Sequence, residues 1–127
     1  MSVRLLMVDD NCEFRAILKS YLITQNLNLE IFEATSAEMA VTKASFVKPH
    51  IILMDINLPK LNGLAAAREI LKDLPACHLI ILTMFEIEAF KKAAKDVNAF
   101  DFIAKSDIYE RLVPAIKKCP EFAKACI

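Results

Sequence analysis

Glycine is almost missing from this sequence, with one residue among 127. Loops that wrap a phosphate with backbone amides need several glycines close together, both in P-loops and in dinucleotide-binding turns. Gly63 alone cannot supply such a loop. The sequence therefore excludes the P-loop nucleotide-binding class and the dinucleotide-binding class.

An excess of charge of one sign is also missing, because 16 lysines and arginines balance 16 aspartates and glutamates. Binding to nucleic acid or to a membrane surface needs clustered excess cations, so neither is expected of this domain. No apolar run approaches the ~18 residues of a membrane span. Met1 to Asp10 lacks the features of a signal peptide. We therefore predict a cytoplasmic protein with no membrane contact.

The four cysteines show no Cys-x-x-Cys spacing, and no histidine stands near them at metal-ligand spacing. Cysteines without such partners are most often small buried hydrophobic residues. We predict that role for Cys12, Cys77, Cys119 and Cys126.

A hydrophobic fraction of 56% in 127 residues predicts one domain with a full core. Apolar runs typical of buried strands alternate with segments that have helical periodicity. The predicted strands are Val3 to Val8, Leu29 to Ala34, Ile51 to Met54, Leu79 to Leu82 and Phe100 to Ala104. Strict alternation of this kind predicts an α/β fold with a doubly wound parallel sheet and helices on both faces.

Short polar residues mark several helix ends. Asn11, Ser36 and Ser106 each stand where the side chain can cap a helix. Asn98 is expected in the left-handed conformation that a glycine usually adopts after a helix. On the first helix, apolar residues recur at helical spacing and are expected to face inward: Phe14, Ile17, Leu18, Tyr21 and Leu22.

Polar residues follow four of the five strands directly. They are Asp9 and Asp10, Asp55, Thr83 and Lys105. Each alone has an ordinary interpretation as a cap, a turn residue or a surface charge. Ligands bind beyond the carboxyl ends of parallel strands, however, and these ends converge if the strands concerned are neighbours. Three carboxylates there need a counterion, and Mg²⁺ suits oxygen ligands together with a phosphoryl oxygen.

The same set of residues suits phosphoryl chemistry. Thr83 offers a hydroxyl donor, and Lys105 offers a compact positive charge. Asp55 lies centrally among them, and carboxylates form acyl phosphates, so we interpret Asp55 as the nucleophile.

The chain resembles the receiver domain of two-component response regulators over residues 3 to 118. The resemblance rests on Val8-Asp9-Asp10, on Met54-Asp55 with Pro59 and Gly63, on Leu82-Thr83, and on Phe102-Ile103-Ala104-Lys105. It implies a flavodoxin-like fold of five parallel strands in the order 2-1-3-4-5. The implied division is a receiver domain at 1–118, followed by a tail or the start of a linker at 119–127.

The resemblance also implies roles for the site residues. Asp55 accepts a phosphoryl group from a histidine kinase or phosphotransfer protein, and Mg²⁺ is held by Asp9, Asp10, Asp55 and the backbone carbonyl of Asn57. Thr83 and Lys105 contact the phosphoryl group, and Thr83 and Phe102 form the switch. The domain is then a signalling phosphoacceptor and not an enzyme, since it assists only its own phosphotransfer and dephosphorylation.

Met84 and Phe85 after Thr83 are similar to receivers that precede a LuxR-type DNA-binding domain. This favours a transcription regulator that contacts DNA only through an output domain absent from this chain. The alternative is a stand-alone receiver that acts by docking on another protein. A homodimer through the fourth helix, fifth strand and fifth helix is a further expectation.

A haloacid-dehalogenase-type phosphatase is the alternative from another class, because it also combines an aspartate nucleophile with threonine, lysine and Mg²⁺. That family needs Asp-x-Asp, whereas Asp55 is followed by Ile56 and Asn57. A flavin-binding protein of similar fold is disfavoured, because no loop rich in serine, threonine and glycine follows the first strand.

Overall fold

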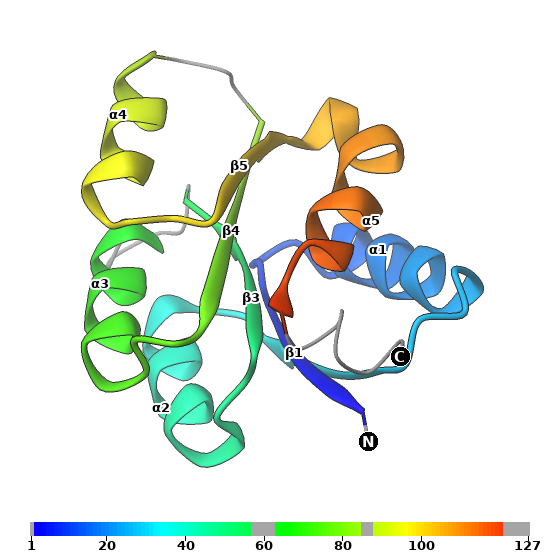
Figure 1. Cartoon of the computed structure of the whole chain (residues 1–127), viewed down its shortest axis with the longest axis horizontal. Helices are drawn as coiled ribbons and strands as arrows, with labels where there is room; N and C mark the ends of the chain where they lie inside the picture. Colours follow the sequence, from blue (N-terminus) through cyan, green and yellow to red (C-terminus); the bar gives the residue numbers. More distant parts are fainter. Residues whose placement is uncertain (1, 57–62, 85–87, 121–127) are drawn as a thin grey trace.

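The computed structural model describes residues 2–56, 63–84 and 88–120. Its strands are β1 (Val3–Val8), β2 (Leu29–Ala34), β3 (Ile51–Asp55), β4 (His78–Thr83) and β5 (Asp101–Ala104). They form one parallel sheet in the order β2-β1-β3-β4-β5 (Figure 1). The predicted fold class and strand order are both confirmed.

Helices cover both faces of this sheet. They are α1 (Cys12–Thr24), α2 (Ala37–Val47), α3 (Gly63–Asp73), α4 (Glu88–Asp96) and α5 (Ile108–Lys117), with a 3₁₀ turn η1 (Lys105–Asp107) before α5. Figure 1 shows α2, α3 and α4 on one face and α1 and α5 on the other. Within the described ranges, no helix is both long enough and apolar enough to cross a membrane.

The sheet divides the core into two hydrophobic clusters. One contains residues of α2, α3 and α4 with every second residue of the central strands, such as Ile52 and Met54. The other contains residues of α1 and α5 with the alternate set, such as Ile51 and Leu53. All five residues of β3 are therefore buried, which explains its unbroken apolar run in the sequence.

Two of the three predicted caps are present. The side chain of Asn11 accepts a hydrogen bond from the backbone N–H of Phe14, and that of Ser36 accepts one from Met39. Asn98 has the predicted left-handed backbone, with φ of 62°. The predicted cap at Ser106 is wrong, because this residue lies inside η1 and α5 begins only at Ile108.

Two expectations for burial also need correction. The side chain of Ile17 is 55% exposed, although the helical period placed it with the inward residues. Cys77 and Cys119 are buried as predicted, but Cys12 is exposed at the start of α1. Cys126 lies outside the described residues.

The single glycine begins α3 at a point where the helix meets the end of β3. A Cβ atom on Gly63 would collide with the carbonyl oxygen of Asp55 and would lie 2.9 Å from the Cα of Ile56. Both neighbours are backbone atoms, which cannot rotate away as a flexible side chain can. Glycine is therefore required here because there is no space for a Cβ atom. Its absence lets the start of α3 approach the backbone of Asp55 closely.

We expect Gly63→Ala to destabilise the protein by about 1–3 kcal/mol, the usual cost of overpacking a tight contact. Helix propensity alone would favour alanine by up to about 1 kcal/mol, so the two effects predict opposite signs. Urea unfolding measures the difference, and amide NMR shifts at Asp55 and Ile56 report the local displacement. Gly63→Ser carries the same Cβ and should cost at least as much. Unchanged or increased stability in both variants would show that the close approach relaxes freely.

Candidate functional site

Three carboxylates meet at the carboxyl edge of the sheet. One oxygen each from Asp9, Asp10 and Asp55 lies within 4.8 Å of the other two. Asp55 ends β3, and Asp9 follows β1, where Val8 is the strand partner of Met54. Asp9 and Asp55 are buried, whereas Asp10 is exposed. This acidic cluster offers hard oxygen ligands with an open side, a donor set that can hold a divalent cation.

Lys105 supplies the positive charge of the cluster. Its Nζ lies 2.7 Å from Oδ2 of Asp9 and 3.6 Å from Oδ2 of Asp55. The Lys105 side chain is only 11% exposed, so the ion pair is weakly screened and its desolvation must be offset by close contacts. The ammonium thus bridges two carboxylates from different strands.

The backbone around Asp9 is held by contacts outside the cluster. Its N–H donates to the carbonyl of Ala34 over 3.1 Å, and its Oδ1 accepts from the N–H of Asn11 over 2.9 Å. Its carbonyl accepts a 2.6 Å hydrogen bond from Nη1 of Arg15, whose Nε lies 3.1 Å from Oε1 of Glu33. Strand β2 and helix α1 therefore both fix the position of the Asp9 carboxylate.

The sequence matches the family model of the response regulator receiver domain over residues 5–117. This chain belongs to that family. Response regulator protein VraR of Staphylococcus epidermidis is 34% identical over 121 residues, which cover 95% of this chain and 58% of the relative. VraR of Staphylococcus aureus is 32% identical over 118 residues, covering 93% and 56% respectively. This receiver domain spans a little over half the length of these relatives.

Solved structures agree with this assignment. A LuxR-family two-component response regulator from Aurantimonas sp. superimposes with a TM-score of 0.84 at 28% identity, covering 98% of this chain and 94% of that one. Chemotaxis protein CheY4 of Vibrio cholerae gives a TM-score of 0.85 at 21% identity, covering 94% and 99%, and shows the fold alone. The matches support a signalling receiver domain and not the phosphatase alternative.

Thr83 and Phe102 of the receiver lie on the other face of the sheet from Asp55. Thr83 is fully buried at the end of β4 and pairs with Ala104 of β5. Parallel partners and residues two apart share a face, so Thr83, Ala104 and Phe102 point the same way. Phe102 packs against the core cluster under α2, α3 and α4, whereas Asp55 shares its face with Leu53 of the opposite cluster.

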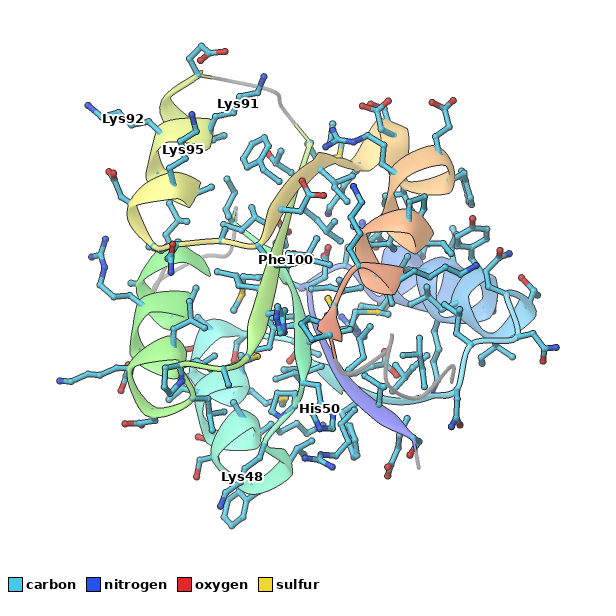
Figure 2. All side chains as sticks on the ribbon, in the orientation of Figure 1. Lys48, His50, Lys91, Lys92, Lys95 and Phe100 are labelled. Atoms are coloured by element: carbon cyan, nitrogen blue, oxygen red, sulfur yellow. The ribbon has the colours of Figure 1, made fainter. Side chains whose placement is uncertain are left out.

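Phe102 also lines a surface pocket of about 300 Å³ between α4, β5 and α5. Three cations border this pocket: Lys91 and Lys95 from α4, and Arg111 from α5. Nη2 of Arg111 lies 3.3 Å from the carbonyl oxygen of Phe102, and so joins α5 to β5. Figure 2 shows Lys91, Lys92 and Lys95 projecting from α4. We name the surface of α4, β5 and α5 the 4-5-5 face.

The structure therefore brings Asp9, Asp10, Asp55 and Lys105 together and sets Phe102 apart from them. Asn57 and Pro59 lie outside the described residues. Sequence reasoning missed two residues of α1 that touch the site, Phe14 under Lys105 and Arg15 beneath Asp9. Their place in the first turn after Asp9-Asp10 was the available signal, because that turn stays beside the strand end.

Proposed function

We propose that this receiver domain accepts a phosphoryl group on Asp55 from the phosphohistidine of a kinase or phosphotransfer protein. The observation that carries the proposal is the Asp9, Asp10 and Asp55 cluster with the Lys105 ammonium 3.6 Å from Asp55. Membership of the receiver family supports the reaction, and VraR is itself named a response regulator.

In the proposed reaction a carboxylate oxygen of Asp55 forms a bond to phosphorus while the bond from phosphorus to the histidine nitrogen breaks. The electron pair of that bond stays on the imidazole, which takes a proton from solvent. In this proposal Lys105 neutralises charge on the transferred group, and Thr83 donates its hydroxyl to that group from the end of β4, the strand next to β3.

The oxygen-rich cluster fits Mg²⁺, which would neutralise charge on the phosphoryl oxygens. Asp9, Asp10 and Asp55 would hold it, together with the backbone carbonyl of Asn57. The buried Asp9 and Asp55 keep two oxygens fixed, and the exposed Asp10 leaves the site open to solvent and partner.

With Mg²⁺ and acetyl phosphate, we expect the intact protein to gain one base-labile phosphoryl group, because acetate is a good leaving group. Asp55→Asn should abolish the gain, and chelation of Mg²⁺ should prevent it in the wild type. Intact-mass spectrometry measures the product. Asp73→Asn, which changes an exposed aspartate at the end of α3, is the matched control. A wild-type chain that stays unmodified with acetyl phosphate and with a competent kinase would refute the proposal.

Phosphorylation is proposed to act on the 4-5-5 face through Thr83 and Phe102. The phosphoryl group carries about −1.5 to −2 charges in place of the single charge of the Asp55 carboxylate, and its acceptor oxygens draw the Thr83 hydroxyl toward Asp55. Thr83 and Phe102 share a sheet face, so a shift of Thr83 changes the space available to the Phe102 ring. The pocket lined by Phe102 lies on the 4-5-5 face, where we propose that a homodimer or a partner protein docks.

Beryllofluoride with Mg²⁺ should therefore move amide NMR signals from Asp55 through Thr83 to Phe102. Thr83→Val keeps the side-chain shape but removes the hydroxyl, so in this variant the shifts should stop at the metal site. Thr83→Ser retains the hydroxyl and is the matched control. Equal shifts at Phe102 in the valine and serine variants would exclude the hydroxyl as the link.

We further propose that this receiver belongs to a longer cytoplasmic regulator that binds DNA through a separate output domain. The LuxR-family neighbour and the VraR relatives, of which the chain covers 58% or less, support this. In this proposal residues 1–118 form the receiver and residues 119–127 begin the linker.

The native gene product is therefore expected to be clearly larger than the 14.3 kDa of this chain. An immunoblot of source cells with an antibody against the receiver measures its size. A band at the size of the receiver alone would instead favour a stand-alone receiver that docks on another protein.

A further inference from the structure

The ammonium of Lys105 rests on an aromatic ring as well as on carboxylates. Its Nζ lies 4.1 Å from the centroid of the Phe14 ring, well within the ~6 Å range of cation–π attraction. Phe14 is half-buried in the first turn of α1 and packs against the core cluster beneath α1 and α5. A single nitrogen is therefore contacted by Asp9 after β1, by Asp55 at the end of β3 and by Phe14 of α1.

The Phe14 ring acts on the Lys105 ammonium differently from the carboxylates, because it restricts the position of the ammonium and does not fix the direction of its N–H donors. A lysine has a flexible four-carbon stem and three rotatable donors, so carboxylates alone define its head group poorly. An aromatic face attracts a cation through its quadrupole and does not require a hydrogen bond of fixed direction. With three donors on the ammonium, Lys105 can therefore meet the Asp9 oxygen at 2.7 Å and the Asp55 oxygen at 3.6 Å while it rests on the ring.

We propose that Phe14 is a positioning residue for phosphotransfer. It holds the Lys105 ammonium at a point from which Lys105 can exchange the Asp9 carboxylate for a phosphoryl oxygen on Asp55. The ring stays beneath the ammonium during this exchange, so Lys105 is not released to solvent when it leaves Asp9. This inference rests on the proposed function, because it assigns Phe14 a part in the reaction at Asp55.

A purely structural role for Phe14 makes a different prediction. The ring also lines a pocket of about 190 Å³ with Leu18, Tyr21 and Ile108, and leucine is an apolar replacement that keeps part of that packing. Leucine has no π face, so Phe14→Leu separates the contact with the cation from the filling of the core. Phe14→Tyr keeps the ring and should rescue any loss that depends on it.

Tyr21 provides the matched control on the same helix and in the same pocket. Its ring meets Tyr109 edge to face at 4.8 Å, and its hydroxyl donates to the Tyr109 carbonyl over 3.2 Å. Tyr21→Leu therefore removes an aromatic ring between α1 and α5 and leaves the Phe14 contact with Lys105 in place.

Two measurements test the proposal on the intact chain. The first is the NMR shift of the Lys105 ε-methylene protons, which the Phe14 ring current should displace in wild type and in Phe14→Tyr but not in Phe14→Leu. The second is the initial rate of phosphorylation by acetyl phosphate at saturating Mg²⁺. We expect Phe14→Leu to lower that rate by about three- to tenfold, the range that one cation–π contact supports. Phe14→Tyr and Tyr21→Leu should stay within about twofold of wild type on the same grounds.

A Phe14→Leu rate equal to that of wild type would overturn the proposal, as would an equal loss in Tyr21→Leu. If the wild type itself is not phosphorylated, the proposed function fails, and the positioning role in phosphotransfer fails with it. The Lys105 proton shifts then still decide whether the ring holds the ammonium. The two failures are therefore distinguishable.

Discussion

Asp9 and Asp55 are buried at the ends of adjacent strands, and the sheet holds one oxygen of each within 4.8 Å of the other. At an effective dielectric constant of about 20, two charges at that distance repel by about 3 kcal/mol. The sheet imposes this repulsion, because β1 and β3 are central strands whose register is fixed by burial on both faces. The Lys105 ammonium meets both carboxylates, and a metal ion or a phosphoryl group, bound as proposed, would alter that balance. The proposed response of the site to these ligands would thus follow from its own electrostatics.

The sheet also separates the chemistry from the surface that is proposed to respond to it. Asp55 lies on the face covered by α1 and α5, together with the Phe14 ring beneath Lys105. Thr83 and Phe102 lie on the face covered by α4. Ala104 is the strand partner of Thr83, and the next residue along the chain is Lys105. The end of β5 is therefore the place where the two faces are joined, with Lys105 reaching one face and Phe102 the other.

The sequence predicted those features that depend on local pattern. The bounds of β1 and β2 match the prediction because polar or turn residues end their apolar runs sharply. The strand order needed the family resemblance, since apolar runs alone do not say which strands are neighbours. The prediction that Ile17 faces inward was wrong, because a wide apolar stripe on a helix does not show which of its residues the neighbouring elements cover. The ion pair of Lys105 with Asp9 joins residues 96 positions apart. The contact of the Phe14 ring with Lys105 is also long-range, and the position of Phe14 in the first turn of α1 was its one signal in the sequence.

The scarcity of glycine shows where this fold tolerates strain and where it does not. Residues other than glycine occupy left-handed backbone at Asn26, Lys48 and Asn98, at about 1–2 kcal/mol for a residue such as lysine. Lys48, at the end of α2 (Figure 2), is supported there because its carbonyl accepts hydrogen bonds from Nε and Nη2 of Arg4. Neighbouring contacts can thus offset a dihedral penalty. No such compensation is available at Gly63, where a Cβ would meet the backbone of Asp55 itself. The one glycine therefore stands where a side chain would displace the carboxylate on which the proposed chemistry depends.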